Sequence, residues 1–106
     1  MRIVRRDRAR ADILDIFEHI FGNDEDAADR WLDAVNETID RVIAKNPRIG
    51  VKRDYGRPAL VGFRMLAVGN FPNYLVFYRI DGTVIRIVRV LHGARDIPNV
   101  LDPPDT

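Results

Sequence analysis

Apolar residues recur every three or four positions in two neighbouring segments near the N-terminus, which is the spacing of amphipathic helices. The first segment covers residues 8–21, and the second runs from about residue 24 to about residue 45. Gly22 is placed to end the first helix and Asn46-Pro47 to end the second, because the residue before a proline avoids the helical region. Since only two or three residues separate the segments, we predict that the helices pack as an antiparallel hairpin.

The second half of the chain changes to short runs of apolar residues, which indicate strands. The strands are predicted over residues 62–68, 73–80 and 83–91. Asp81-Gly82 joins the last two as a two-residue hairpin turn, and the resulting register places Tyr74 opposite Arg89. Both faces of this hairpin are largely apolar, so one face should meet the helices, and the other must be covered or bind a partner.

Together these elements predict an α+β fold in a single domain of residues 1–106, since a chain of this length holds one core. A short N-terminal strand at residues 2–5 precedes the antiparallel two-helix hairpin, which packs on a three- to four-stranded, mainly antiparallel sheet. The last segment, residues 98–106, contains three prolines and is expected to be a partly disordered tail.

Charge is segregated along the chain, although the net charge is only +1. Residues 7–40 hold eleven acids and three bases, whereas residues 45–95 hold ten bases and two acids. Such a dipolar chain can attract an anionic partner to its basic half while staying near neutral overall. The simpler interpretation is that acidic helices lie against a basic sheet, and the two interpretations are compatible.

Several kinds of chemistry are excluded or disfavoured by composition. The chain has no cysteine and no serine, which excludes disulfides, cysteine-ligated zinc and serine or cysteine nucleophiles. His19 and His92 lie far apart in the sequence, and no carboxylate spacing around them indicates a metal site, so we expect neither a metal nor another cofactor. No apolar run reaches the ~20 residues of a membrane span, and the lack of cysteine favours a cytoplasmic protein.

The stretch "RVLHGARDI", residues 89–97, brings His92, Arg95 and Asp96 together directly after a strand. Metal-free ribonucleases can use such residues, because arginines hold the scissile phosphate and a histidine moves the proton. The candidates for that chemistry are Arg64, Arg89, His92 and Arg95. The alternative is structural: the sheet arginines stack on tyrosines, and Arg95 pairs with Asp96 to hold the tail.

Four segments, in this order and spacing, resemble the ParE side of the RelE/ParE toxin superfamily of bacterial type II toxin–antitoxin systems. They are "RARADILDIFEHI", "AADRWLDAVNETIDRVIAKNPRIG", "GFRMLAVGNFPNYLVFYR" and "VIRIVRVLHGARDI". The resemblance covers about residues 7–97, and its most specific part is "YLVFYR" followed by "RVLHGARDI". It implies a strand, a helix hairpin and an antiparallel sheet, in agreement with the apolar pattern.

The resemblance also implies a protein partner. Toxins of this superfamily are neutralised by a cognate antitoxin, here a ParD-like ribbon-helix-helix protein, whose C-terminal segment lies beside the helix hairpin and along the sheet. The residues expected to line that antitoxin groove are Ile13, Phe17, Trp31 and Val35. Operator DNA would be bound only through the antitoxin, and no membrane is involved.

Members of the superfamily divide by activity, since RelE-like toxins cut mRNA in the ribosomal A site, whereas ParE-like toxins are associated with inhibition of DNA gyrase. RelE-type ribonucleases carry an arginine where this chain has Tyr74, and they tend to end with a catalytic tyrosine, which residues 97–106 lack. The resemblance therefore favours a gyrase-inhibiting toxin that acts by binding, with a ribosome-dependent endoribonuclease as the alternative. The surface expected to touch the target comprises Arg64, Tyr74, Tyr78, Arg89, His92 and Arg95.

Overall fold

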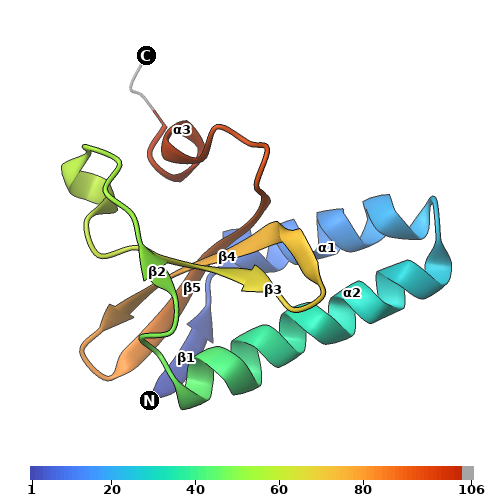
Figure 1. The fold of residues 1–106 in the computed structure, drawn as a ribbon, viewed down its shortest axis with the longest axis horizontal. Helices are drawn as coiled ribbons and strands as arrows, with labels where there is room; N and C mark the ends of the chain where they lie inside the picture. Colours follow the sequence, from blue (N-terminus) through green and yellow to red (C-terminus); the bar gives the residue numbers. More distant parts are fainter. Residues whose placement is uncertain (104–106) are drawn as a thin grey trace.

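A five-stranded sheet carries two long helices on one face and a loop with a short helix on the other (Figure 1). The computed structural model describes residues 1–103. Its elements are β1 (Arg2–Arg5), α1 (Asp7–Phe21), α2 (Glu25–Glu37), η1 (Thr38–Ile43), β2 (Val51–Lys52), η2 (Pro58–Leu60), β3 (Arg64–Val68), β4 (Phe71–Asp81), β5 (Val84–His92) and α3 (Ile97–Leu101). The predicted α+β fold is confirmed, as are the helix hairpin and the three main strands. None of the helices described is long and apolar enough to cross a membrane.

The sheet has the order β1-β5-β4-β3-β2, in which β1 runs parallel to β5 and the other neighbouring pairs are antiparallel. It has one strand more than the three or four that were expected. The additional strand is β2, in which Val51 and Lys52 pair with Met65 and Arg64 at the edge of the sheet. Two residues are too few to give a periodic pattern of apolar positions, so the sequence offered no signal for this strand.

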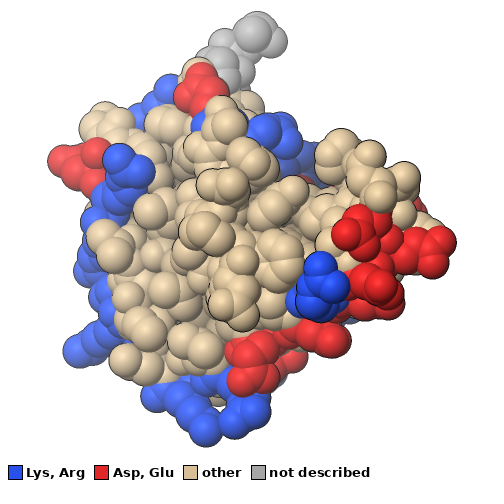
Figure 2. Space-filling model, turned by 45° about the vertical axis from the view of Figure 1, so that its right-hand side comes forward, with Lys and Arg blue, Asp and Glu red and all other residues tan. Residues whose placement is uncertain are grey.

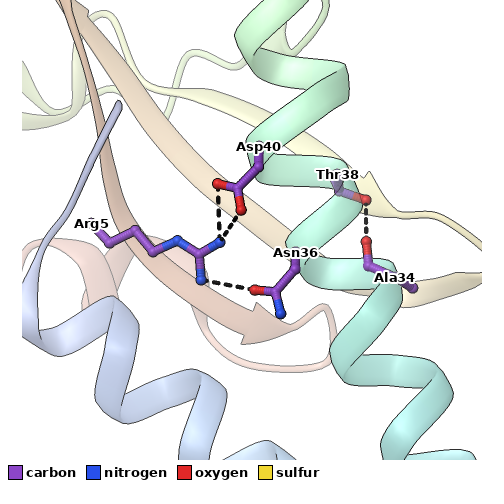
Figure 3. Close-up of polar contacts among 5 residues, drawn as sticks. All are labelled: Arg5, Ala34, Asn36, Thr38 and Asp40. Atoms are coloured by element: carbon purple, nitrogen blue, oxygen red, sulfur yellow. Dashed lines mark hydrogen bonds and ion pairs between the residues drawn. The ribbon is translucent and has the colours of Figure 1, made fainter. Parts of the chain in front are cut away.

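The second helix does not keep one winding along its length, because η1 continues α2 as a π-helical turn. The buried Thr38 hydroxyl donates to the Ala34 carbonyl at 2.8 Å (Figure 3) and accepts from the Gly69 amide at 3.2 Å. A threonine bonded to the carbonyl four residues earlier competes with the helical ladder, and π turns interrupt α-helices at such places. Thr38 therefore links the change of winding to the turn between β3 and β4.

Arg5 ties the first strand to the second helix (Figure 3). Its guanidinium donates to the Asn36 side chain at 2.9 Å and to both carboxylate oxygens of Asp40, at 3.1 and 3.2 Å. Because Asp40 is more than half exposed, this pair adds little to stability, but it fixes where the end of the helix lies relative to β1.

Apolar side chains fill both faces of the sheet. The core under α1 and α2 contains Ala9, Ile13, Trp31, Val35, Ile39, Ile43, Val68, Val76, Tyr78, Ile85, Ile87 and Val90. A second, smaller core on the opposite face contains Leu60, Phe63, Phe77, Leu91 and Ile97, and η2 and α3 contribute to it. The two apolar faces expected from the sequence are thus both covered within this chain.

The predicted register of the β4–β5 hairpin is wrong. Asp81 pairs with Val84, so the two-residue turn is Gly82-Thr83, and Gly82 supplies the positive φ of 60° that the turn requires. A bulge between Ile87 and Arg89 then shifts the pairing again, so that Arg89 lies opposite Phe77. Tyr74, which was expected beside Arg89, lies opposite His92.

The tail is held by an arginine other than the one expected. Within the described residues Arg95 forms no ion pair with Asp96, and α3 occupies the first part of the expected tail instead. Arg57 donates from Nη1 to the carbonyls of Pro98 at 3.0 Å and Asp102 at 2.8 Å. The expectation of disorder also included residues 104–106, which lie outside the described residues.

Candidate functional site

The end of β5 lies against the middle of α1 and leaves a small hollow of about 120 Å³ between them. The hollow is lined by Asp12, Asp15, Ile16, Val90, Leu91, His92 and Arg95. It brings His92 and Arg95 together, as the sequence indicated. It also places two carboxylates from α1 beside them, more than seventy residues away along the chain.

His92 is exposed, yet its ring is held on two sides. The ring meets Tyr74 edge-on with 5.1 Å between centroids, and Tyr74 in turn meets Trp31 at 5.6 Å. The amide of Ala94 donates to Nδ1 of His92 at 3.0 Å. Because Nδ1 accepts that bond, the proton of the neutral ring lies on Nε2. A fixed imidazole with an available Nε2 can bind a partner's acceptor or move a proton.

The side chain of Arg89, unlike that of His92, is not available to a partner, because Asp12 binds it in a bidentate ion pair. Nε and Nη2 of Arg89 donate to the two carboxylate oxygens of Asp12 at 2.7 and 2.9 Å, and the Val90 amide adds a third bond at 3.0 Å. The two side chains are only 11% and 12% exposed. This geometry is the strong, bidentate form of the arginine–carboxylate pair, and it joins α1 to β5. The guanidinium is therefore not available to hold a phosphate.

Arg64 and Tyr78 form a second structural unit, which we call the loop clamp, at the other end of the sheet. Nη1 of Arg64 donates to the carbonyls of Arg48 at 3.1 Å and Gly50 at 2.9 Å. The Tyr78 hydroxyl donates to the Pro47 carbonyl at 2.7 Å and accepts from the Gly50 amide at 2.8 Å. The loop clamp thus fixes residues 47–50, which lead from η1 into β2.

Burial in the core raises the pKa of Tyr78 above its ordinary value of 10.0, although the bond from Gly50 and the charge of Arg64 oppose that effect. The unfolded chain releases this proton near pH 10, whereas the folded chain holds it to higher pH. Unfolding is therefore favoured increasingly as the pH rises above 10. We expect Tyr78→Phe, which has no proton to lose, to show a smaller fall in the free energy of unfolding between pH 9 and 11 than the unchanged chain.

Urea denaturation at a series of pH values measures this difference. Tyr74→Phe serves as the control, because it removes a hydroxyl from a half-buried ring that is outside the loop clamp. Parallel pH profiles for Tyr78→Phe and the unchanged chain would contradict the assignment.

The six residues expected on one target-binding surface fall into two places. Tyr74, His92 and Arg95 gather at the end of β5, where Arg89 is bound to Asp12 of the same hollow. Arg64 and the fully buried Tyr78 belong to the loop clamp at the other end of the sheet. The polar groups of Arg89, Arg64 and Tyr78 thus hold the fold together, while Tyr74, His92 and Arg95 offer exposed or half-exposed groups.

The residues expected to line an antitoxin groove lie mostly inside the molecule. Trp31 and Val35 have no exposed surface and Ile13 is 7% exposed, because all three face the sheet. Phe17 is half-buried, and its ring lies 5.7 Å from that of Phe21. The large apolar side chains exposed on α1 are those of Leu14 and Phe21, which are 56% and 43% exposed. The outer side of α1 therefore carries an apolar strip that the periodicity of the core residues did not single out.

Among residues 1–103, no group of three or more histidine, cysteine, aspartate or glutamate side chains could hold a metal ion. Asp12 is the one residue at the β5 end whose role was missed. No pattern in the sequence could have identified it, since its partner Arg89 lies 77 positions away.

Comparison with known proteins matches this chain to a family model and to solved toxin–antitoxin structures. Residues 3–97 match the model of the ParE toxin of the type II toxin–antitoxin system parDE. A structure of the chromosomal ParDE toxin–antitoxin system from P. aeruginosa superposes with a TM-score of 0.71 at 20% identity, covering 87% of this chain and 95% of that chain. The toxin–antitoxin complex RelBE2 from Mycobacterium tuberculosis gives a TM-score of 0.60 at 26% identity, covering 86% and 95%.

No curated protein matches the sequence. The family match nevertheless spans most of the chain, from β1 to the beginning of α3, and therefore includes the β5 end and the loop clamp. This chain belongs to the ParE toxin family of type II toxin–antitoxin systems.

Proposed function

We propose that this toxin acts by binding a type II topoisomerase, DNA gyrase, and that a cognate antitoxin neutralises it. His92 and Arg95, with Tyr74 behind them, form the target-contacting part of the β5 end. Their side chains combine a fixed imidazole, an exposed guanidinium and an aromatic ring, which are groups that often supply much of the energy of protein interfaces.

The observation that carries the proposal is that two of the arginines needed for ribonuclease chemistry are already engaged. Asp12 binds Arg89, and backbone carbonyls bind Arg64 at the other end of the sheet. The hollow beside His92 is also lined by the exposed Asp15, whose carboxylate repels a phosphodiester, while Asp12 is occupied by Arg89. A binding role uses this end of β5 without requiring a site that grips phosphate.

Purified toxin added to a gyrase supercoiling reaction is expected to inhibit it at micromolar concentration. The double variant His92→Ala with Arg95→Ala should raise the concentration for half-inhibition by about tenfold or more, since truncating two interface residues costs at least about 1.4 kcal/mol. The matched control is His19→Ala with Arg10→Ala, which removes the same two side-chain types from exposed positions on α1. Uninhibited supercoiling at micromolar toxin would remove gyrase as the target.

We propose further that the antitoxin is ParD-like and covers the outer side of α1. Both similar structures are toxin–antitoxin assemblies by their titles, which supports such a partner. Leu14, Phe17 and Phe21 provide an apolar strip at helical spacing, which suits the apolar side of an amphipathic segment. The protein encoded by a neighbouring open reading frame should co-purify with the toxin. The Leu14→Asp and Phe21→Asp double variant should lose that protein, which tests this contact.

The alternative is a ribosome-dependent endoribonuclease, and one observation favours it. His92 is oriented by Tyr74 and by the Ala94 amide, and the N–H of its Nε2 is free to donate a hydrogen bond to a reacting phosphate group beside Arg95. This function predicts cleavage of ribosome-bound message that His92→Ala abolishes. Intact message in a primer-extension assay on stalled ribosomes would exclude it.

A further inference from the structure

Four exposed cations line the segment that leads from η1 to the edge of the sheet, and we call this surface the basic edge. It consists of Lys45, Arg48, Lys52 and Arg53. Figure 2 shows Lys and Arg side chains mainly along one side and the lower end of the molecule, while Asp and Glu side chains concentrate on the opposite side. The segregation of charge along the sequence is therefore also a segregation in space.

Within the described part of the chain, the cations of the basic edge have no acidic partners. Among residues 1–103, none of the four forms an ion pair, whereas Arg41, Arg57, Arg79 and Arg86 each lie within 4.0 Å of a carboxylate. Asp54 is the only acid between residues 41 and 80, and its carboxylate accepts from the Gly56 amide at 2.7 Å. The positive charge of this edge is thus left for a partner to neutralise.

The backbone that carries these cations is fixed in place by the loop clamp. Arg64 and Tyr78 bind the carbonyls and the amide of residues 47–50, and β2 continues the segment as a strand of the sheet. The guanidinium of Arg64 adds a positive charge directly behind the edge. A fixed backbone reduces the entropy that is lost when the long side chains contact a ligand.

Two hollows lie beside the basic edge, so its surface is not flat. One, of about 400 Å³, is lined by the three bases Lys52, Arg53 and Arg57 and by one acid, Asp54, with Tyr55 and Leu60 among its other walls. The guanidinium of Arg53 lies 5.9 Å from the centre of the Tyr55 ring. The other hollow, of about 350 Å³, lies beside Arg48. Cations around open hollows suit a bulky, repeating anion better than a single small one.

We infer that the basic edge binds the phosphate backbone of duplex DNA, an inference that rests on the proposed function, because a topoisomerase holds such a duplex. Half of the cations are lysines, which protein interfaces disfavour but which neutralise phosphates well. The contacts read no base edges, so this binding is independent of sequence and differs from operator recognition by an antitoxin. The toxin would then reach gyrase on DNA, with the β5 end facing the enzyme.

Fluorescence anisotropy with a labelled 30-base-pair duplex and full-length toxin tests the inference. Four phosphate contacts predict that log K falls with log salt with a slope of about −3.6, or about 150-fold between 50 and 200 mM salt. Two duplexes of unrelated sequence should bind equally. The variant with Lys45, Arg48, Lys52 and Arg53 all changed to Gln should lose at least about 20-fold in affinity at 50 mM salt and most of the slope.

The charge-matched control changes Arg6, Arg8, Arg10 and Arg30 to Gln. These four are also exposed and without ion pairs among the described residues, but they alternate with the acids of α1 and α2. The control should keep the affinity within about threefold, and a melting curve establishes that both variants fold. Equal loss in the control, absence of duplex binding at 50 mM salt, or binding only to single-stranded RNA or to an acidic protein would overturn the inference.

The supercoiling assay separates this inference from the proposed function. If the toxin inhibits gyrase but does not bind duplex DNA, DNA binding by the basic edge is refuted and gyrase remains the target. If the toxin binds the duplex but does not inhibit gyrase, DNA binding is supported and gyrase is refuted as the target.

Discussion

Replacing Asp12 with alanine is expected to lower the free energy of unfolding by about 3 kcal/mol, the largest effect predicted for any polar residue of this chain. The substitution leaves the guanidinium of Arg89 without a counter-charge at a site that is 11% exposed. It also removes the acceptor of the Val90 amide. Breaking one side of a buried ion pair is costly because the remaining charge stays out of water unpaired.

Urea denaturation of the purified chain measures the change. Asp15→Ala is the matched control, since it removes the same side chain from an exposed position one turn along α1, and it should change stability by less than about 0.5 kcal/mol. The double variant Asp12→Leu with Arg89→Met should recover much of the loss, because two apolar side chains leave no unpaired charge. If Asp12→Ala were as stable as Asp15→Ala, the guanidinium of Arg89 would have to be hydrated once its partner is removed, which would contradict the prediction.

Gly50→Ala is expected to cost about 2–3 kcal/mol, because no side chain fits at this position. A Cβ built on Gly50 would lie 2.5 Å from the Tyr78 hydroxyl and 2.8 Å from a carbon of its ring. Tyr78 cannot move away without losing its bonds to Pro47 and Gly50, and its ring is fully buried in the core. The close approach of backbone and ring is thus what requires glycine here.

Thermal and urea unfolding test this expectation against Gly69→Ala. The control adds the same methyl group where the nearest atom, the Thr38 hydroxyl, is 4.0 Å away, and it should be nearly neutral. Combining Gly50→Ala with Tyr78→Leu should cost at least about 1 kcal/mol less than the sum of the single effects, since the smaller side chain removes the clash. Additive losses would show that the methyl group is accommodated by another movement.

The loop clamp and the ion pair of Asp12 explain why the residues chosen as a site divide so sharply. Arg64, Tyr78 and Arg89 have the side-chain types of a functional site, but their polar atoms are used within the fold. His92 and Arg95 remain available at the end of β5. In a chain with this many arginines, whether each one is free for a partner depends on the partner it has already found.

The fold could be predicted to a large extent, because helices and strands leave periodic signals in the order of apolar and polar residues. The ends of α1, the stop at Asn46-Pro47 and the three long strands all followed from local patterns. The register of β4 and β5 could not be obtained in this way. A turn shifted by one residue and a bulge after Ile87 change which residues pair. Neither changes the alternation of apolar and polar residues enough to be detected in the sequence.

The sequence by itself determined the α+β architecture, the family and the separation of acidic from basic residues, since these depend on local order and composition. Only the tertiary structure decided which arginines are free, that Tyr74 meets His92 edge-on, and that Trp31 and Val35 are buried against the sheet. It also placed at one edge four cations that have no ion pair within residues 1–103. These properties depend on pairs that are distant in the chain, such as Asp12 with Arg89 and Gly50 with Tyr78. Such pairs form because burial and hydrogen bonding select partners in space, and no local pattern records that choice.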